Sequence, residues 1–287
     1  MGIAQPPLSK QIADLEREVG AQLFHRTGHG VFPTAAGEAL LARARTIVAE
    51  IEAIDGDVGR AARGESGELR LGFVGSALID LLPAVLGRFG AERPRVRLRL
   101  QERSSAGCAA ALAGGAFDTI VTRGAPHGLG VERMRSVVVG HDRLAALVPG
   151  DHPLAGTDPL TIDRLRGLTL ITASPDEEPA TAVTLPRLQA GRIIHAHDVH
   201  TIAGLVACGV GIGLGPSGVR KVIRPDVRVH DIEPAVSLPP LMLSFRDDDP
   251  SPVLSAFLSV VWSLRPSARR SLTRYGREPA GANGTGH

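Results

Sequence analysis

The sequence LLARARTIVAEIEAIDGDV, residues 40–58, carries the strongest structural signal in the chain. Its apolar residues alternate between spacings of four and three, which is the a/d pattern of a helix that packs along a second helix. This row consists of Leu40, Ala44, Ile47, Ile51, Ile54 and Val58. A helix over about residues 35–59 would be roughly 37 Å long, more than any neighbouring segment could cover. The pattern favours pairing with a second copy of the chain, and the alternative is a helix that lies on a globular core.

A shorter amphipathic helix is predicted upstream of this row. Its apolar face consists of Leu8, Ile12, Leu15 and Val19, which recur at helical spacing. The prolines at 6–7 suit a first turn, and Gly20 suits the end of the helix. The opposite face carries Gln5, Ser9, Lys10 and Asp14. Side chains of this kind can reach base edges or phosphates, although spacing alone favours an ordinary solvated face.

A tight hairpin is predicted between the two helices. Short apolar pairs flank Gly28 and Gly30 within residues 23–34, which is typical of two strands joined by a glycine turn. Thr34 follows the hairpin and is well placed to cap the long helix. The N-terminal part therefore reads as helix, wing and long helix.

The rest of the chain has the pattern of an α/β protein. A small, polar, glycine-rich hinge at residues 61–67 is followed by predicted strands that alternate with helices. This alternation indicates βαβ units and mostly parallel sheets. The pattern is repeated in a second group from about residue 141 to 240, after which a strand and an apolar helix over residues 253–264 return to the first group. We therefore expect two lobes joined by two crossings.

Composition excludes several classes of protein. With 3% aromatic residues, base stacking on single-stranded nucleic acid is a poor expectation. No apolar run approaches the ~18 residues of a membrane helix, and no signal peptide is evident. Cys108 and Cys208 are too far apart for a CxxC motif. Residues 1–66 hold seven Lys or Arg against nine Asp or Glu, so charge alone does not predict DNA binding. We expect a cytoplasmic protein without a membrane partner.

Two motifs invite other interpretations. His195, His197 and His200 could suggest a metal, but Asp198 between them is well placed as the N-cap of a helix. Residues 213–218 fit GxGxxG, yet they come late and contain a proline, so we interpret them as a strand end and a cleft wall. No catalytic motif is present. We therefore expect no metal, no cofactor and no enzyme, with a two-lobed α/β enzyme as a weaker alternative.

Taken in order, the motifs resemble those of LysR-type transcriptional regulators. The N-terminal matches are AQPPLSKQIADLE (4–16), GAQLFHRT (20–27) and PTAAG (33–37), and the later ones are GELRLG (67–72), GDHPL (150–154) and VACGVGIGLGP (206–216). The resemblance covers about residues 3–265. GFVGSA (72–77) is similar to the branch that governs aromatic-compound catabolism and responds to muconate.

The resemblance implies a winged helix-turn-helix over residues 1–34, a dimerisation helix over 35–60, a hinge over 61–67 and a periplasmic-binding-protein-like effector domain over 68–265. Lobe I would hold about 68–140 and 241–265, lobe II about 141–240, and residues 266–287 would be a disordered tail. Two helices that brace the recognition helix in the family are missing before Met1. We expect the native start to lie further upstream. The alternative is a truncated sensor module that has lost DNA binding.

The resemblance also implies partners and site residues. The partners are double-stranded promoter DNA, a small organic acid effector, RNA polymerase and further copies of the chain in a dimer or tetramer. The recognition helix would present Gln5, Pro6, Ser9 and Lys10 to DNA, with Arg26 of the wing on the backbone or minor groove.

Candidate effector residues follow predicted strands. Ser76, Ser104 and Ser105 offer hydroxyls beyond two strand ends, where open α/β sheets bind ligands. Ser76 and Ser105 match positions that hold a carboxylate in muconate-responsive members, although plain N-capping is the alternative for each serine. Arg123 could pair with a second carboxylate, and His200 would line the cleft from lobe II.

Overall fold

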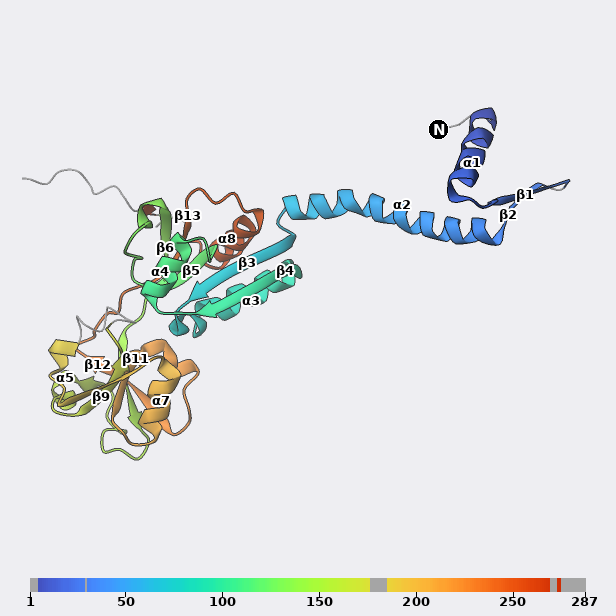
Figure 1. Cartoon of the computed structure of the whole chain (residues 1–287). Helices are drawn as coiled ribbons and strands as arrows, with labels where there is room; N and C mark the ends of the chain where they lie inside the picture. Colours follow the sequence, from blue (N-terminus) through green and yellow to red (C-terminus); the bar gives the residue numbers. More distant parts are fainter. Residues whose placement is uncertain (1–4, 29, 176–184, 269–272, 275–287) are drawn as a thin grey trace, which may run out of the picture. The chain divides into compact units, whose positions relative to one another are not determined.

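The computed structural model describes residues 5–28, 30–175, 185–268 and 273–274. It divides into two compact units, residues 1–60 and 61–287. Within the described residues, no helix combines the length and the apolar character needed to cross a membrane. Figure 1 draws the whole chain, with the long helix in light blue.

The first unit contains the predicted helix, hairpin and long helix. Helix α1 runs over Gln5–Val19, strands β1 (Phe24–Thr27) and β2 (Gly30–Pro33) pair antiparallel, and α2 runs over Ala35–Ala62. The long helix continues three residues beyond its predicted end at about residue 59. These elements confirm the period-based predictions.

Polar contacts at the helix ends hold the first unit together. The Glu16 carboxylate of α1 accepts hydrogen bonds from the backbone N–H groups of Leu23 (2.7 Å) and Phe24 (3.1 Å). Thr34 caps α2 as predicted, because its Oγ1 accepts from the Gly37 N–H at 3.0 Å. A Cβ at Gly37 would overlap the Leu23 carbonyl oxygen. Leu23 and Gly37 are the only buried residues among those whose burial is described in this unit.

Lobe I of the second unit is a six-stranded sheet in the order β14-β6-β13-β5-β3-β4. The strands are β3 (Ser66–Phe73), β4 (Arg95–Glu102), β5 (Thr119–Arg123), β6 (Met134–Gly140), β13 (Leu241–Arg246) and β14 (Thr273–Arg274). Its helices are α3 (Leu81–Glu92), α4 (Ser105–Ala113) and α8 (Pro252–Leu264), with short 3-10 helices η1 (Gly75–Leu78) and η2 (Val131–Arg133). Phe89 of α3 meets Phe257 of α8 edge to face, 5.3 Å between ring centroids.

Lobe II is a second six-stranded sheet, in the order β10-β9-β11-β7-β12-β8. The strands are β7 (Leu144–Pro149), β8 (Leu160–Thr161), β9 (Thr169–Ala173), β10 (Arg192–Ala196), β11 (Ile212–Pro216) and β12 (Val227–Glu233). Its short helices include α5 (Ile162–Leu165), α7 (Val199–Ala207) and η3 (Ser217–Lys221). Two apolar clusters form its core, so the predicted two-lobed α/β architecture is confirmed.

The sheets are mixed rather than mostly parallel, which corrects the prediction. In lobe I, β3 pairs parallel with β4 and β5, whereas β13 pairs antiparallel with β5 and β6. In lobe II, β9 pairs parallel with β10 and β11, whereas β7 pairs antiparallel with β11 and β12. Hydrophobic periodicity identifies strands but does not report the direction in which a returning strand enters the sheet.

The two crossings between the lobes, residues 141–143 and 234–240, run side by side. The Leu144 N–H donates to the Val236 carbonyl at 2.8 Å, and the Leu238 N–H donates to the Asp142 carbonyl at 3.0 Å. An antiparallel bridge joins Arg143 and Ser237 between these bonds. The crossings therefore form a short two-stranded ribbon.

The C-terminal segment differs from the expected disordered tail where it is described. Ala268 is buried in the core of lobe I, and β14 pairs with β6. Residues 269–272 and 275–287 of the expected tail lie outside the described residues.

Gly72 tests the packing of β3 against Phe117, which lies in the loop between α4 and β5. A Cβ at Gly72 would overlap the aromatic ring of Phe117, and overpacking of a core costs about 1–3 kcal/mol. Gly72→Ala should therefore lower the free energy of unfolding by this amount in urea denaturation. Gly87→Ala on α3 is the matched control, because nothing lies within 4 Å of its Cβ position. That change should raise stability slightly, and equal effects of the two substitutions would contradict the packing argument.

Candidate functional site

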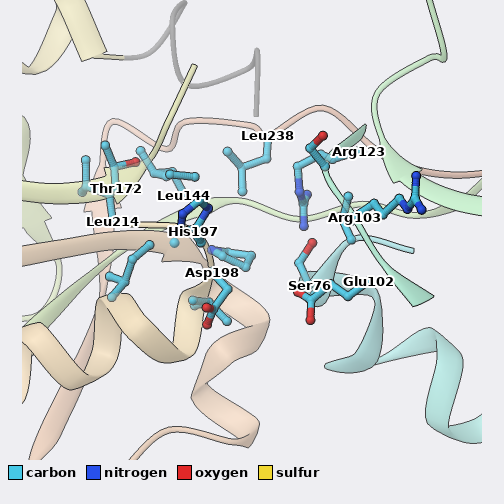
Figure 2. Close-up of a pocket in the computed structure, with 18 of the residues that line it drawn as sticks. Ser76, Glu102, Arg103, Arg123, Leu144, Thr172, His197, Asp198, Leu214 and Leu238 are labelled. Atoms are coloured by element: carbon cyan, nitrogen blue, oxygen red, sulfur yellow. The ribbon is translucent and has the colours of Figure 1, made fainter. Parts of the chain in front are cut away.

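A cavity of about 440 Å³ lies between the two lobes. Lobe I supplies a polar wall made of Val74, Gly75, Ser76, Glu102, Arg103, Ser104 and Arg123. Lobe II and the crossings supply mostly apolar side chains, including Leu144, Leu185, Ile202, Leu214 and Leu238, with Thr172, His197 and Asp198. Figure 2 shows these two groups facing one another across the cavity.

The topology explains why these residues meet. Strands β3, β4 and β5 are parallel neighbours, so their carboxyl ends share one edge of the sheet. Ser76 follows β3, Ser104 follows β4, and Arg123 is the last residue of β5. In lobe II, Thr172 lies at the end of β9 and His197 follows β10. The cavity is therefore built from strand ends of both lobes.

Arg123 is the buried cation of the cavity wall, with its side chain 3% exposed. Its Nη1 donates to the Pro239 carbonyl at 3.1 Å, and its Nη2 lies 3.8 Å from Oδ2 of Asp142. Both partners belong to the crossings. Asp142 is itself held by Ser217 of lobe II, whose Oγ donates to Oδ1 at 2.6 Å. Figure 2 shows the guanidinium pointing into the cavity.

The structure brings three of the five predicted effector residues to the cavity: Ser76, Ser104 and Arg123. Ser104 also caps α4, because its Oγ accepts from the Gly107 N–H at 3.1 Å. Ser105 is buried and is not part of the lining; its Oγ lies 3.5 Å from the Arg123 carbonyl. His200 lines a smaller cavity of about 260 Å³ on lobe II instead.

Asp198 caps α7, as the sequence predicted. Its carboxylate accepts from the N–H groups of His200 (2.7 Å) and Thr201 (2.9 Å) and from the Thr201 hydroxyl (2.8 Å). Burial alone would raise the pKa of Asp198, but these hydrogen bonds outweigh burial and hold the pKa below its ordinary value. Within the described part of the chain, no group of three or more His, Cys, Asp or Glu is arranged to hold a metal ion.

Sequence reasoning missed several lining residues. Thr172 lies near the end of β9, His197 follows β10, and Glu102 is the last residue of β4. The prediction used the rule that ligands bind beyond strand ends, but only for selected strands of lobe I. The same rule, applied to every strand of both lobes, would also have found these three residues. The apolar wall had no signal of its own, because core leucines and cavity leucines look alike in sequence. Gly215 and Pro216 do line the cavity, in agreement with the interpretation of the GxGxxG segment.

The lobes also meet beside Ser76. Ile79 packs against a core cluster of lobe II, and Asp80 accepts a hydrogen bond from the Lys221 ammonium at the end of η3. Arg265, after α8, donates to the second oxygen of Asp80 at 3.2 Å. The segment that carries Ser76 is thus joined directly to lobe II.

The first unit presents its predicted residues as follows. Gln5 and Pro6 lie in the first turn of α1, Ser9 and Lys10 are exposed on α1, and Arg26 is exposed on β1. Along α2, Leu40 is half-buried and the rest of the a/d row is exposed, namely Ala44, Ile47, Ile51, Ile54 and Val58. Among the described residues of this unit, none packs over the exposed part of this row.

A two-lobed α/β unit with a cavity between its lobes, preceded by a long helix and by a helix with a wing, defines a ligand-responsive DNA-binding regulator. Residues 62–264 match the family described as the LysR substrate binding domain, and residues 1–38 match the bacterial regulatory helix-turn-helix protein, lysR family. The chain belongs to the LysR family of transcriptional regulators.

Individual relatives agree with this assignment. The chain is 31% identical to the HTH-type transcriptional regulator AlsR of Bacillus subtilis (strain 168), over 91% of this chain and 87% of AlsR. Full-length CbnR in complex with its target DNA shares the fold at a TM-score of 0.73 and 24% identity, over 94% of this chain and 90% of CbnR. The BenM effector binding domain with its effector benzoate superposes at a TM-score of 0.58 and 20% identity, over 76% of this chain and 99% of that domain.

The contact between Asp80 and Lys221 should make stability depend on pH. The hydrogen bond from Lys221, helped by the charges of Lys221 and Arg265 and opposed by burial, lowers the pKa of Asp80 from its ordinary 3.8. A lowered pKa in the folded state stabilises the fold above the unfolded pKa, and this stabilisation is lost as the pH falls. Asp80→Asn should lower the melting temperature by about 1–3 °C at pH 7.

This difference between wild type and variant should shrink as the pH falls below 3.8. Asp163→Asn is the control, because Asp163 is more exposed and pairs within lobe II with Arg166. A difference for Asp80→Asn that is unchanged at acidic pH would show that the contact does not act through charge.

Proposed function

We propose that the cavity between the lobes binds a small carboxylate-bearing effector that controls the action of this regulator on promoter DNA. The observation that carries the proposal is the buried guanidinium of Arg123, which points into the cavity. Charge-assisted hydrogen bonds from arginine suit carboxylates, and they are stronger where water is excluded. Ser76 and Ser104 supply hydroxyls on the same wall.

The opposite wall supports an effector with an apolar body. Leu144, Leu214 and Leu238 approach the cavity from lobe II and the crossings. A volume of about 440 Å³ lies within the range of small-molecule sites. Benzoate, the effector of the BenM domain, combines a carboxylate with an apolar ring. This chain offers a polar wall and an apolar wall to a ligand of the same general design.

On the DNA side, we assign the recognition surface to α1. Gln5, Pro6, Ser9 and Lys10 face the major groove, where Gln5 can pair with adenine and Lys10 with guanine or a phosphate. Arg26 of the wing contacts the backbone or minor groove and adds affinity with little base information. RNA polymerase is the further partner that this role requires.

Two chains pair through the exposed row of α2 in this proposal. Ile47, Ile51 and Ile54 are 55%, 59% and 54% exposed in the single chain, and a continuous apolar row of this kind is stable in water only when a partner covers it. Pairing places two recognition helices on one duplex, so the DNA site should be pseudo-palindromic. Further pairing of dimers would give a tetramer.

Ile47→Glu tests the pairing. A carboxylate in the apolar row should convert dimers to monomers in analytical ultracentrifugation, because burying an unpaired charge is costly. Selection from a random duplex library should enrich two-fold symmetric sites with the wild type and none with the variant. Ala49→Glu, on the exposed opposite side of α2, is the control and should remain a dimer. A monomeric variant that still selects symmetric sites would refute the pairing.

Arg123 tests the effector site. The full chain should bind 3-phenylpropanoate about 10- to 100-fold more tightly than 3-phenylpropanamide in calorimetric titrations, because a hydrogen bond to a charged group contributes about 1.5–3 kcal/mol. Arg123→Gln should remove this preference, and Arg123→Lys should retain part of it. Equal affinity of wild type for acid and amide would overturn the proposed carboxylate site.

A further inference from the structure

A second charged group faces the cavity from the same wall as Arg123. Glu102, the last residue of β4, lines the cavity together with Gly75 and Ser76. Its carboxylate lies against Gly75 so closely that a Cβ on residue 75 would overlap Oε1. Glycine at position 75 therefore allows the carboxylate to lie beside Ser76, as Figure 2 shows.

The Glu102 carboxylate is not committed to another part of the protein. Across the described residues, no hydrogen bond or ion pair to Glu102 is formed. The other carboxylate of the lining, Asp198, is fully engaged in capping α7. Glu102 is thus the acidic group that remains for a ligand.

The two arginines of the lining, Arg103 and Arg123, also differ in whether their guanidinium groups face the cavity. Arg103 turns away from the cavity in Figure 2, where its guanidinium stacks 5.5 Å from the centre of the Phe117 ring and donates to Gln101 at 3.3 Å. Arg123 points inward. The polar wall therefore presents one guanidinium, which also pairs with Asp142 of the crossings, and one carboxylate to the ligand.

A ligand that carries only a carboxylate matches this wall poorly. Its charge is attracted by the buried guanidinium of Arg123 and repelled by the carboxylate of Glu102. A ligand with a cationic group next to its carboxylate satisfies both side chains. Because both charges lie on the lobe I wall, the charged groups of the ligand lie at one end and its apolar body faces lobe II.

We propose that the effector is a zwitterion, an amino acid with an apolar side chain, whose carboxylate binds Arg123 and whose ammonium binds Glu102 and the Ser76 hydroxyl. This inference rests on the proposed carboxylate site and adds the ammonium subsite. It makes Glu102 the residue that determines specificity between simple acids and amino acids.

The test uses matched probes and the full chain. L-phenylalanine differs from 3-phenylpropanoate only by its ammonium group, and L-leucine differs in the same way from 4-methylpentanoate. In calorimetric titrations of the wild type, at least one amino acid should bind tenfold or more tightly than its matched acid. Glu102→Gln should weaken the binding of that amino acid at least tenfold and should leave the acid unchanged or bound more tightly. Glu132→Gln, at an exposed carboxylate outside the cavity, should change neither affinity.

The outcomes separate the two proposals. If each acid binds as tightly as its amino acid, or if Glu102→Gln weakens acid and amino acid equally, the ammonium subsite is refuted. A preference for 3-phenylpropanoate over its amide would then still support the carboxylate site at Arg123. If acid and amide also bind alike, both proposals fail together.

Discussion

The ligand-binding unit depends on how one buried cation is compensated. A guanidinium removed from water is stable only when hydrogen bonds and opposite charge replace its hydration. Arg123 obtains these partners from the Pro239 carbonyl and the Asp142 carboxylate, which belong to the two crossings. The side chain of a lobe I strand is thus tied to the ribbon that connects the lobes. Arg123 therefore links the wall of the cavity to the segment that joins the two lobes.

The two lobes differ in the kind of side chain that each contributes to the cavity. Lobe I supplies charge and hydroxyls, lobe II supplies apolar surface, and direct contacts beside Ser76 hold the two together. Any ligand that fills the cavity would contact charged and hydroxyl groups of lobe I and apolar groups of lobe II. In this chain, as a member of the LysR regulators, such a unit follows a DNA-binding unit.

Local features were predictable from the sequence, and long-range features were less so. The row in α2 and the caps at Thr34 and Asp198 follow from spacing and side-chain chemistry within one element. Strand direction was not predictable, because β13 enters lobe I only after the chain has passed through lobe II. At the site, Ser76 and Arg123 were found from strand ends. Glu102, the last residue of β4, was missed although the same rule covers it. Only its close approach to Gly75, 27 positions away in the chain, had no signal in the sequence.

The apolar row of α2 has a geometric consequence for the pairing proposed above. A strict alternation of four and three residues has a period of 3.5, whereas a straight helix has 3.6 residues per turn. The row therefore drifts by about 20° for each heptad. Over the 2.5 heptads from Leu40 to Val58 it winds about 50° around the helix axis. Two such helices can keep contact along the whole row only by wrapping around one another in a left-handed superhelix.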